Sequence, residues 1–190
     1  MTPVGIKTYR VNEIFYSIHG EGFMSGTPMV FVRFAGCDLA CGFCDTEFES
    51  YKEMSQAEIV RTVQAYGSEW VCFTGGEPML QLDDALVAAF KGHLKCIETN
   101  GLREVCFDEH IDHVTVSPKT PAHTIKAHPD EWRYIIHAGD KLPEAPHAAR
   151  HAYLSPVHGD AKALKTCIEL VKAHPGLKLS TQQHKEWGIR

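Results

Sequence analysis

Three cysteines in one short loop constrain this chain more than any other feature. They stand at Cys37, Cys41 and Cys44, with three residues between the first two and two between the last two. An iron–sulfur cubane is normally held by four thiolates, and no fourth cysteine lies nearby. Three ligands leave one metal position open, as catalytic metal sites do for a substrate or a cofactor. The loop therefore predicts a [4Fe–4S] cluster with one reactive iron.

Two other interpretations of the cysteines fit the sequence less well. A structural zinc site usually takes two closely spaced Cys or His pairs, and the second pair is missing, although twelve histidines are dispersed along the chain. A disulfide framework would need an even number of cysteines and an export signal, whereas there are seven cysteines and the first residues carry no such signal. A non-catalytic zinc-binding module stays open as an alternative. We expect the remaining cysteines to be buried as small hydrophobic residues: Cys72, Cys96, Cys106 and Cys167.

Length and charge exclude several classes of protein. A chain of 190 residues is expected to form a single domain over residues 1–190. The net charge is −5 and the basic residues are dispersed, which argues against nucleic acid as a partner. The longest apolar run, at about residues 85–90, is too short to cross a membrane. Free thiols and an exposed cluster require a reducing compartment, so we expect the cytoplasm.

Short strand-like runs alternate with helical patterns, which predicts parallel strands joined by crossover helices. We expect helices after the capping box that starts at Ser55, over about residues 80–91, and after the cap Asp160, the last with an apolar stripe of Leu164, Ile168 and Val171. A complete eight-unit barrel takes about 250 residues. The chain therefore predicts a partial, open TIM-like α/β barrel of about six parallel strands and about three main helices. The expected strands cover about residues 13–18, 29–34, 70–74, 94–98, 113–116, 132–136, 152–154 and 177–180.

Four unusual loops each follow an expected strand directly. Function collects at the carboxyl ends of the strands in such folds, so these loops should form one site. They are the cysteine loop, Gly75-Gly76-Glu77-Pro78, Thr99-Asn100-Gly101 and Ser117-Pro118-Lys119.

The cysteine triad followed by Gly75-Gly76-Glu77-Pro78 resembles the radical S-adenosylmethionine (SAM) superfamily. The resemblance implies that the open iron binds the methionine part of SAM and that the reduced cluster splits SAM to a 5′-deoxyadenosyl radical. The radical would be carried by the cofactor, so no side chain is expected to be catalytic in its own right. Glycines without Cβ atoms would let the backbone approach the cofactor closely.

Four segments are more narrowly similar to the 7-carboxy-7-deazaguanine synthase family. They are residues 15–22, Cys44-Asp45-Thr46, residues 116–119 and the tail around residues 182–185. This resemblance implies a lyase of queuosine and 7-deazapurine biosynthesis that converts 6-carboxy-5,6,7,8-tetrahydropterin to 7-carboxy-7-deazaguanine with loss of ammonia. It also implies a magnesium ion, a homodimer and an electron donor such as flavodoxin or ferredoxin. The closest rival within the enzymes is an activating enzyme that places a glycyl radical on a partner protein.

The resemblance also implies which residues bind each ligand. The expected SAM contacts are Phe43, Cys44, Asp45, Gly76, Ser117, Pro118 and Lys119. The expected substrate contacts are Ile18, His19, Gly20, Glu21, Arg33, Thr74, His184 and the carboxylate of Arg190. The family usually has Gln at the positions of His19 and Ser155, which leaves the role of the His19 side chain open. Arg33 and His184 could instead be ordinary surface residues.

Two further assignments follow from substrate chemistry. A pterin presents an amino group and a ring N–H side by side, and the carboxylate of Glu98 could accept both; alternatively, Glu98 caps the next turn. Mg²⁺ binds through one or two hard oxygen ligands and keeps several waters. Thr46 is the expected neutral ligand beside the substrate carboxylate, unless its hydroxyl only satisfies its own loop.

Overall fold

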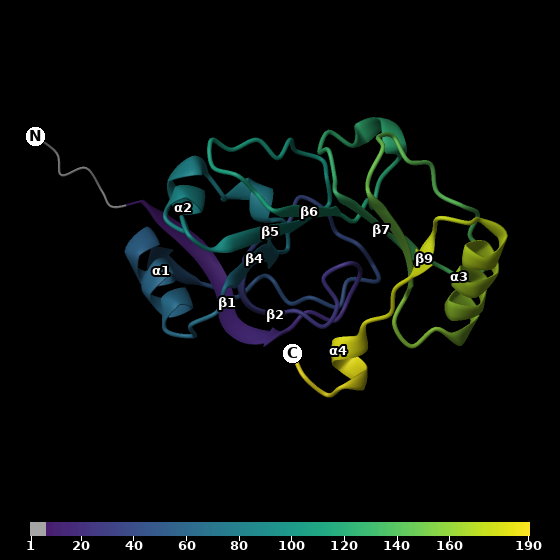
Figure 1. Ribbon diagram of the computed structural model, residues 1–190, viewed down its shortest axis with the longest axis horizontal. Coiled ribbons are helices and arrows are strands. Elements are labelled where there is room, and N and C mark those ends of the chain that lie inside the picture. Colours follow the sequence, from purple (N-terminus) through teal and green to yellow (C-terminus); the bar gives the residue numbers. More distant parts are fainter. Residues whose placement is uncertain (1–6) are drawn as a thin grey trace, which may run out of the picture.

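The fold is one curved sheet with its three longest helices on the outer face (Figure 1). The computed structural model describes residues 7–190, so the first residues, where we expected no export signal, lie outside the described part. The nine strands are ordered β3-β1-β2-β4-β5-β6-β7-β8-β9. β2 and β4 to β9 run parallel, and β1 pairs antiparallel with both β2 and β3. The described strands leave β3 and β9 as free edges, which confirms the open barrel.

The strands are β1 (Thr8–Ile18), β2 (Pro28–Phe34), β3 (Lys52–Ser55), β4 (Trp70–Gly75), β5 (Leu94–Thr99), β6 (His113–Val116), β7 (Glu131–Ile136), β8 (His151–Pro156) and β9 (Lys178–Leu179). The helices are α1 (Gln56–Gln64), α2 (Asp84–Ala88), α3 (Ala161–Ala173) and α4 (Gln183–Glu186), with 3₁₀ turns η1 (Pro78–Leu80) and η2 (Ala122–Thr124). The edge strand β3 was missed because its sequence, Lys-Glu-Met-Ser, carries no β-branched or aromatic signal.

Alternation along the strands separates a helix-covered face from an inner face. On the outer face, Val32, Phe34, Phe73 and Ile97 are fully buried in one hydrophobic core with residues of α1 and α2. A second core holds α3 against β6, β7 and β8. Figure 1 shows α1 and α2 at one end of the sheet and α3 at the other. The inner face is thereby left for the site.

The helix expected over residues 80–91 is wrong in its extent. The chain instead forms η1, then a short linker, then α2. Asp83 starts α2, because its carboxylate accepts the Leu86 N–H at 2.9 Å. The apolar residues Leu82 and Phe90 flank α2 and are both buried in the core.

Two further expectations need correction. The fully buried residues of α3 are Ala163 and Cys167. Val171 packs against the same core, as expected, whereas Ile168 is 41% exposed. Cys106 is exposed, whereas the other three dispersed cysteines are buried as expected.

The inner face changes from apolar to polar along the strands. Met29, Phe31, Cys72 and Cys96 form a small buried core at the amino-terminal ends of β2, β4 and β5. Charged and polar side chains follow two residues later on the same face, among them Arg33, Thr74 and Glu98. The fold therefore closes the bottom of the half-barrel and presents polar groups at its carboxyl-terminal rim.

Candidate active site

One cavity of about 770 Å³ occupies the inside of the half-barrel. Its walls come from β1, β2, β4, β5, β7 and β8, from the loops after β1, β2, β4, β5, β6 and β8, and from the last residues of the chain. The cavity brings together all but one of the site residues named above: Ile18, His19, Gly20, Glu21, Arg33, Cys37, Cys41, Phe43, Cys44, Asp45, Thr46, Thr74, Gly76, Glu98, Ser117, Lys119, His184 and Arg190. Pro118 is not among the lining residues. Their individual roles stay predictions.

The cysteine loop follows β2 at the rim of the cavity. The backbone amide of Cys44 donates to the Cys41 carbonyl at 3.1 Å, which forms a tight turn, and the Leu39 amide donates to the Cys37 sulfur at 3.4 Å. Within residues 7–190, no three His, Cys, Asp or Glu side chains converge on a position for a single metal ion. Thiolates of a cubane each bind a different iron atom, so they need not converge. Three thiols on one cavity wall fit a cluster better than they fit zinc.

The two glycines after β4 are required by close backbone packing. A Cβ on Gly75 would lie 2.3 Å from the Phe34 carbonyl oxygen, and its φ of +153° is rare for other residues. A Cβ on Gly76 would lie 2.3 Å from the Gly36 carbonyl oxygen and 3.0 Å from the Cys37 Cβ. These glycines therefore let the β4 loop press against the start of the cysteine loop.

Glu77 ties this glycine loop to the loop after β5. Its carboxylate is fully buried and accepts the Thr99 hydroxyl and the Asn100 backbone N–H, both at 2.8 Å. Burial raises the pKa of Glu77, although these hydrogen bonds oppose the shift. The Asn100 side chain then donates to Asp38 of the cysteine loop at 2.8 Å. Three rim loops are thus joined through one buried carboxylate.

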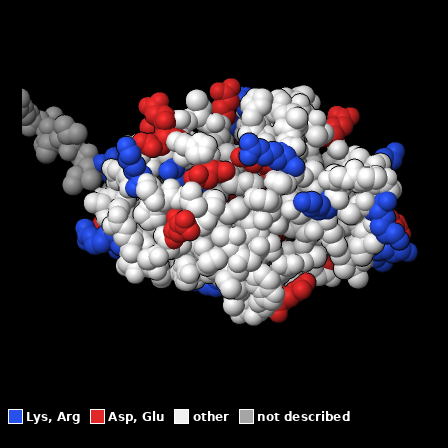
Figure 2. All heavy atoms as spheres, in the orientation of Figure 1, with Lys and Arg blue, Asp and Glu red and all other residues white. Residues whose placement is uncertain are grey.

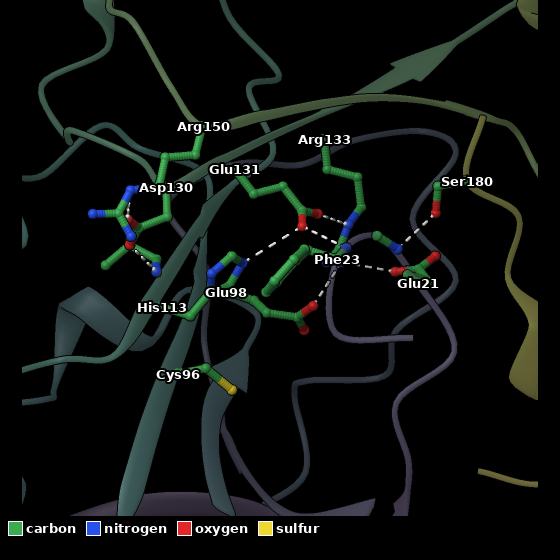
Figure 3. A network of polar contacts seen from close by, with 12 residues as sticks. Glu21, Phe23, Cys96, Glu98, His113, Asp130, Glu131, Arg133, Arg150 and Ser180 are labelled. Atoms are coloured by element: carbon green, nitrogen blue, oxygen red, sulfur yellow. Dashed lines mark hydrogen bonds and ion pairs between the residues drawn. The ribbon is translucent and has the colours of Figure 1, made fainter. Parts of the chain in front are cut away.

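Arg133 on β7 organises the acidic groups of the cavity (Figure 3). Its Nη1 donates to Glu98 at 2.6 Å and to Glu21 at 2.9 Å, and its Nε donates to Glu131 at 3.0 Å. Arg133 as a whole is 3% exposed. One buried cation therefore compensates three carboxylates from three different parts of the chain.

These contacts fix the charge of Glu98. Burial opposes ionisation of Glu98, but Arg133 and His19 outweigh it and hold the pKa of that carboxyl well below its usual range. Burial also works against the charge of Arg133, yet the three carboxylates raise its pKa. The cavity consequently contains an anionic Glu98 at neutral pH, which is an acceptor for N–H groups and not an acid.

Glu98 is already engaged by three donors. Its Oε1 accepts from Arg133 and, at 3.1 Å, from His19 Nε2, and its Oε2 accepts the Thr74 hydroxyl at 3.1 Å. A carboxylate has about four acceptor positions, so one remains. The bidentate contact expected from the sequence would require one of these donors to leave.

Hydrogen bonds to two buried side chains fix the loop between β1 and β2. Glu131, fully buried at the start of β7, accepts the Phe23 backbone N–H at 2.7 Å, and Ser180 accepts the Gly22 N–H at 2.9 Å. His113 lies 3.5 Å from the same Glu131 carboxylate and is 5% exposed. The aromatic ring of Phe23 stacks on His113 and His151. These contacts fix the segment that carries His19 and Glu21.

The last residues of the chain close the open side of the half-barrel. In Figure 1, the chain runs from β9 to α4, and the C-terminus lies beside the end of β1. The Gln183 backbone amide donates to the Gly20 carbonyl at 3.0 Å, and Lys185 pairs with Asp45 behind the cysteine loop. The side chain of Arg190 pairs with Glu13, which also accepts from Arg33 Nε at 2.9 Å. His184 and Arg190 thereby join a cavity whose other walls are distant in sequence.

Lys119 reaches the cavity from the loop after β6. Its Nζ donates to the Ser117 carbonyl at 3.0 Å, and burial lowers its pKa to about 8 against the opposing effect of nearby thiols. Thr46 also lines the cavity, and its carbonyl oxygen is 3.8 Å from the Cys44 sulfur.

Comparison with known proteins places the chain in a family. Residues 31–152 match the model of the radical SAM superfamily. Over 183 residues the chain is 42% identical to the 7-carboxy-7-deazaguanine synthase of Bacteroides thetaiotaomicron, covering 95% of this chain and 98% of the relative. It is 37% identical to that of Bordetella pertussis, covering 95% and 99%. The chain belongs to the 7-carboxy-7-deazaguanine synthase family. It is a radical SAM protein, and the cofactors of that superfamily are a [4Fe–4S] cluster and SAM.

A solved structure supports the fold. The crystal structure of QueE from Escherichia coli aligns with a TM-score of 0.71 at 24% identity, covering 92% of this chain and 94% of that one. The family fold therefore includes the open half-barrel described above. None of the described helices is long and apolar enough to cross a bilayer.

The sequence did not lead us to Arg133, although its side chain binds all three carboxylates of the acidic network. Its signal was a charge inside the apolar run Trp132-Arg133-Tyr134, where a buried strand rarely carries one without a partner. Glu77 was noted only as part of its loop, and Asn100 was not assigned a role.

Proposed function

We propose that this chain converts 6-carboxy-5,6,7,8-tetrahydropterin to 7-carboxy-7-deazaguanine and ammonia, as a carbon–nitrogen lyase of queuosine and 7-deazapurine biosynthesis. The conversion is a redox-neutral rearrangement, because the product and ammonia together contain every atom of the substrate. One observation carries the proposal: a single cavity joins a rim of three thiols to an anionic Glu98 held by Arg133. This combination suits a cofactor at the rim and an N–H-rich heterocycle beneath it.

Cys37, Cys41 and Cys44 would hold the cluster, and its open iron would bind SAM. When bound, these cofactors supply a radical that removes a hydrogen from the carboxyl-bearing carbon of the substrate. The SAM contacts would come from Phe43, Asp45, Gly76 and the segment from Ser117 to Lys119. Asp45 is oriented for this by Lys185 and, at 3.2 Å, by Gln182.

The protein's own residues would bind and orient the pterin. Glu98 would accept an N–H of the pyrimidine ring, while Ile18, Gly20 and Glu21 would form the wall supplied by the β1–β2 loop. Arg33, which lines the cavity beside Arg190 and Phe15, provides positive charge for the substrate carboxylate. Thr46 would add a neutral oxygen ligand to a Mg²⁺ ion bound by the same carboxylate. His184 packs against the β1–β2 loop, since a Cβ on Gly20 would lie 2.5 Å from the His184 backbone nitrogen.

The setting of the reaction is part of the proposal. We expect a homodimer in the cytoplasm that takes its electron from a flavodoxin or ferredoxin. On the face shown in Figure 2, charges of both signs are interspersed among uncharged residues. Such a surface carries no broad basic field for a polyanion.

The test is an anaerobic incubation of the reconstituted protein with the pterin acid, SAM and a reductant. Formation of 7-carboxy-7-deazaguanine, measured by mass spectrometry, supports the proposal. Glu98→Gln should then weaken substrate binding far more than SAM binding. Equal loss of both affinities would assign Glu98 to the fold instead.

A further inference from the structure

His19 connects the β1–β2 loop to Glu98 through both nitrogens of its ring. The residue directly follows β1, is 4% exposed and stacks on Phe31 with ring centroids 5.8 Å apart. Its Nδ1 lies 3.2 Å from the backbone nitrogen of Glu21, and its Nε2 lies 3.1 Å from Glu98 Oε1. The ring therefore spans from a fixed loop to the carboxylate at the centre of the cavity.

These two contacts determine where the ring proton lies. A backbone amide can only donate, so Nδ1 must offer its lone pair to Glu21. In a neutral imidazole the proton then sits on Nε2, from which it is donated to Glu98. A proton on Nδ1 would point the Nδ1–H group at the backbone N–H of Glu21, and neither could accept. The Nε2–H tautomer is the only one that satisfies both contacts.

The result is an asymmetric Glu98. Its Oε1 is saturated by His19 and Arg133, whereas its Oε2 accepts only the Thr74 hydroxyl. A carboxylate without the His19 bond would have a free position on each oxygen and could rotate between them. With the bond, only Oε2 can receive a further donor.

We propose that His19 is a positioning residue, which uses its Nε2–H to saturate Oε1 of Glu98 and so presents Oε2 to an N–H of the substrate. The proposal rests on the proposed function for the identity of that substrate. It makes His19 act through Glu98 and not through a side-chain contact of its own with the pterin.

The tautomer can be tested without any substrate. We suggest ¹⁵N NMR of the holoenzyme labelled on its histidine rings, with the His19 signals assigned by their loss in His19→Gln. The expected result is a ring protonated at Nε2 and unprotonated at Nδ1. A proton on Nδ1 would overturn the proposal, whatever the enzyme acts on.

Three substitutions separate the two ends of the ring. The amide nitrogen of Gln reaches the position of Nε2, so His19→Gln should keep the donor to Glu98 and bind substrate as the wild type does. The amide of Asn reaches only the position of Nδ1, so His19→Asn should keep the Glu21 contact and raise the substrate Kd about ten-fold. His19→Phe keeps the stacking on Phe31, loses both polar contacts and should match His19→Asn. The control is His110→Gln, because His110 is exposed and lies outside the cavity; this variant should have the substrate Kd of the wild type.

Kd values for 6-carboxy-5,6,7,8-tetrahydropterin and for SAM are measured anaerobically on each variant. Weaker binding of the pterin acid with unchanged SAM affinity in the Asn and Phe variants, and rescue by Gln, supports the positioning role. Equal substrate affinity of the Gln and Asn variants, or tighter binding by Asn through a freed Oε1, would overturn it. If the wild type itself does not bind the pterin acid, the proposed function is wrong, and the NMR result still decides the contact between His19 and Glu98.

Discussion

Replacing Arg133 by Met tests how the acidic network is held together. Methionine is of similar length and leaves most of the packing in place, but it removes the one buried cation that faces three carboxylates. Glu131 would remain fully buried with only the Phe23 amide and His113 beside it. Glu21 and Glu98, whose side chains are 17% and 24% exposed, could regain part of their hydration.

The expected cost is large because a charge is left uncompensated in the interior. Removing one partner of a buried ion pair costs about 3–5 kcal/mol. Glu131 accounts for most of this, since it has no route to solvent. With a urea m-value of about 1–3 kcal/mol/M, the unfolding midpoint should fall by at least about 1 M.

The assay is urea unfolding of the anaerobic holoprotein, followed by circular dichroism. The matched control is Arg150→Met, because Arg150 lies 4.0 Å from Asp130 and its side chain is 81% exposed. An exposed pair of this kind contributes about 0–1 kcal/mol. If Arg133→Met is no less stable than Arg150→Met, the guanidinium does not compensate the network and the reasoning is refuted.

Four other outcomes are expected. Alanine at any of the three loop cysteines should abolish iron loading, whereas alanine at Cys72 should not; an iron-replete loop variant would contradict the ligand assignment. Asn100→Ala should lower the iron content after reconstitution, because it removes the bond that steadies the cysteine loop; unchanged iron per chain would contradict this role. Thr46→Ala should lower turnover and magnesium dependence while cluster content and SAM binding stay intact, and full activity in chelator-treated buffer would exclude Thr46. The pKa values of Glu98 and Glu131 are lowered in the fold, so below about pH 4.3 the unfolded chain binds more protons and the free energy of unfolding falls with the pH. In Glu98→Gln the free energy of unfolding should fall less steeply with the pH, and equal slopes for the variant and the wild type would contradict the lowered pKa of Glu98.

The parts of the fold that could be predicted are those with strong local signals. The Ser55 capping box is formed as expected, with the Ser55 N–H donating to Glu58 at 2.8 Å. The parallel strands carry short apolar runs because the helices cover their outer face and a small core buries the amino-terminal part of their inner face. The residues after these strands meet at one rim for a geometric reason, since parallel strands end on the same side.

What could not be predicted depends on contacts distant in sequence. The break in the helix over residues 80–91 arises because Leu82 packs into the core before Asp83 caps α2. In α3, the side chains of Ala163 and Cys167 are buried instead of those of Leu164 and Ile168, because the packing of the helix against the sheet determines which face is buried. Arg133 meets Glu21 across 112 sequence positions. No local sequence pattern indicates such a pair.

The central claim is tested most directly by one anaerobic reaction with substrate deuterated at the carboxyl-bearing carbon. The reconstituted enzyme, SAM and a reductant are incubated with it, and the product, ammonia and 5′-deoxyadenosine are quantified. The account predicts 7-carboxy-7-deazaguanine and ammonia in equal amounts, with deuterium transferred to the 5′ carbon of the adenosyl group, in SAM and in any 5′-deoxyadenosine that is released. Formation of 5′-deoxyadenosine without deuterium and without 7-carboxy-7-deazaguanine would contradict it.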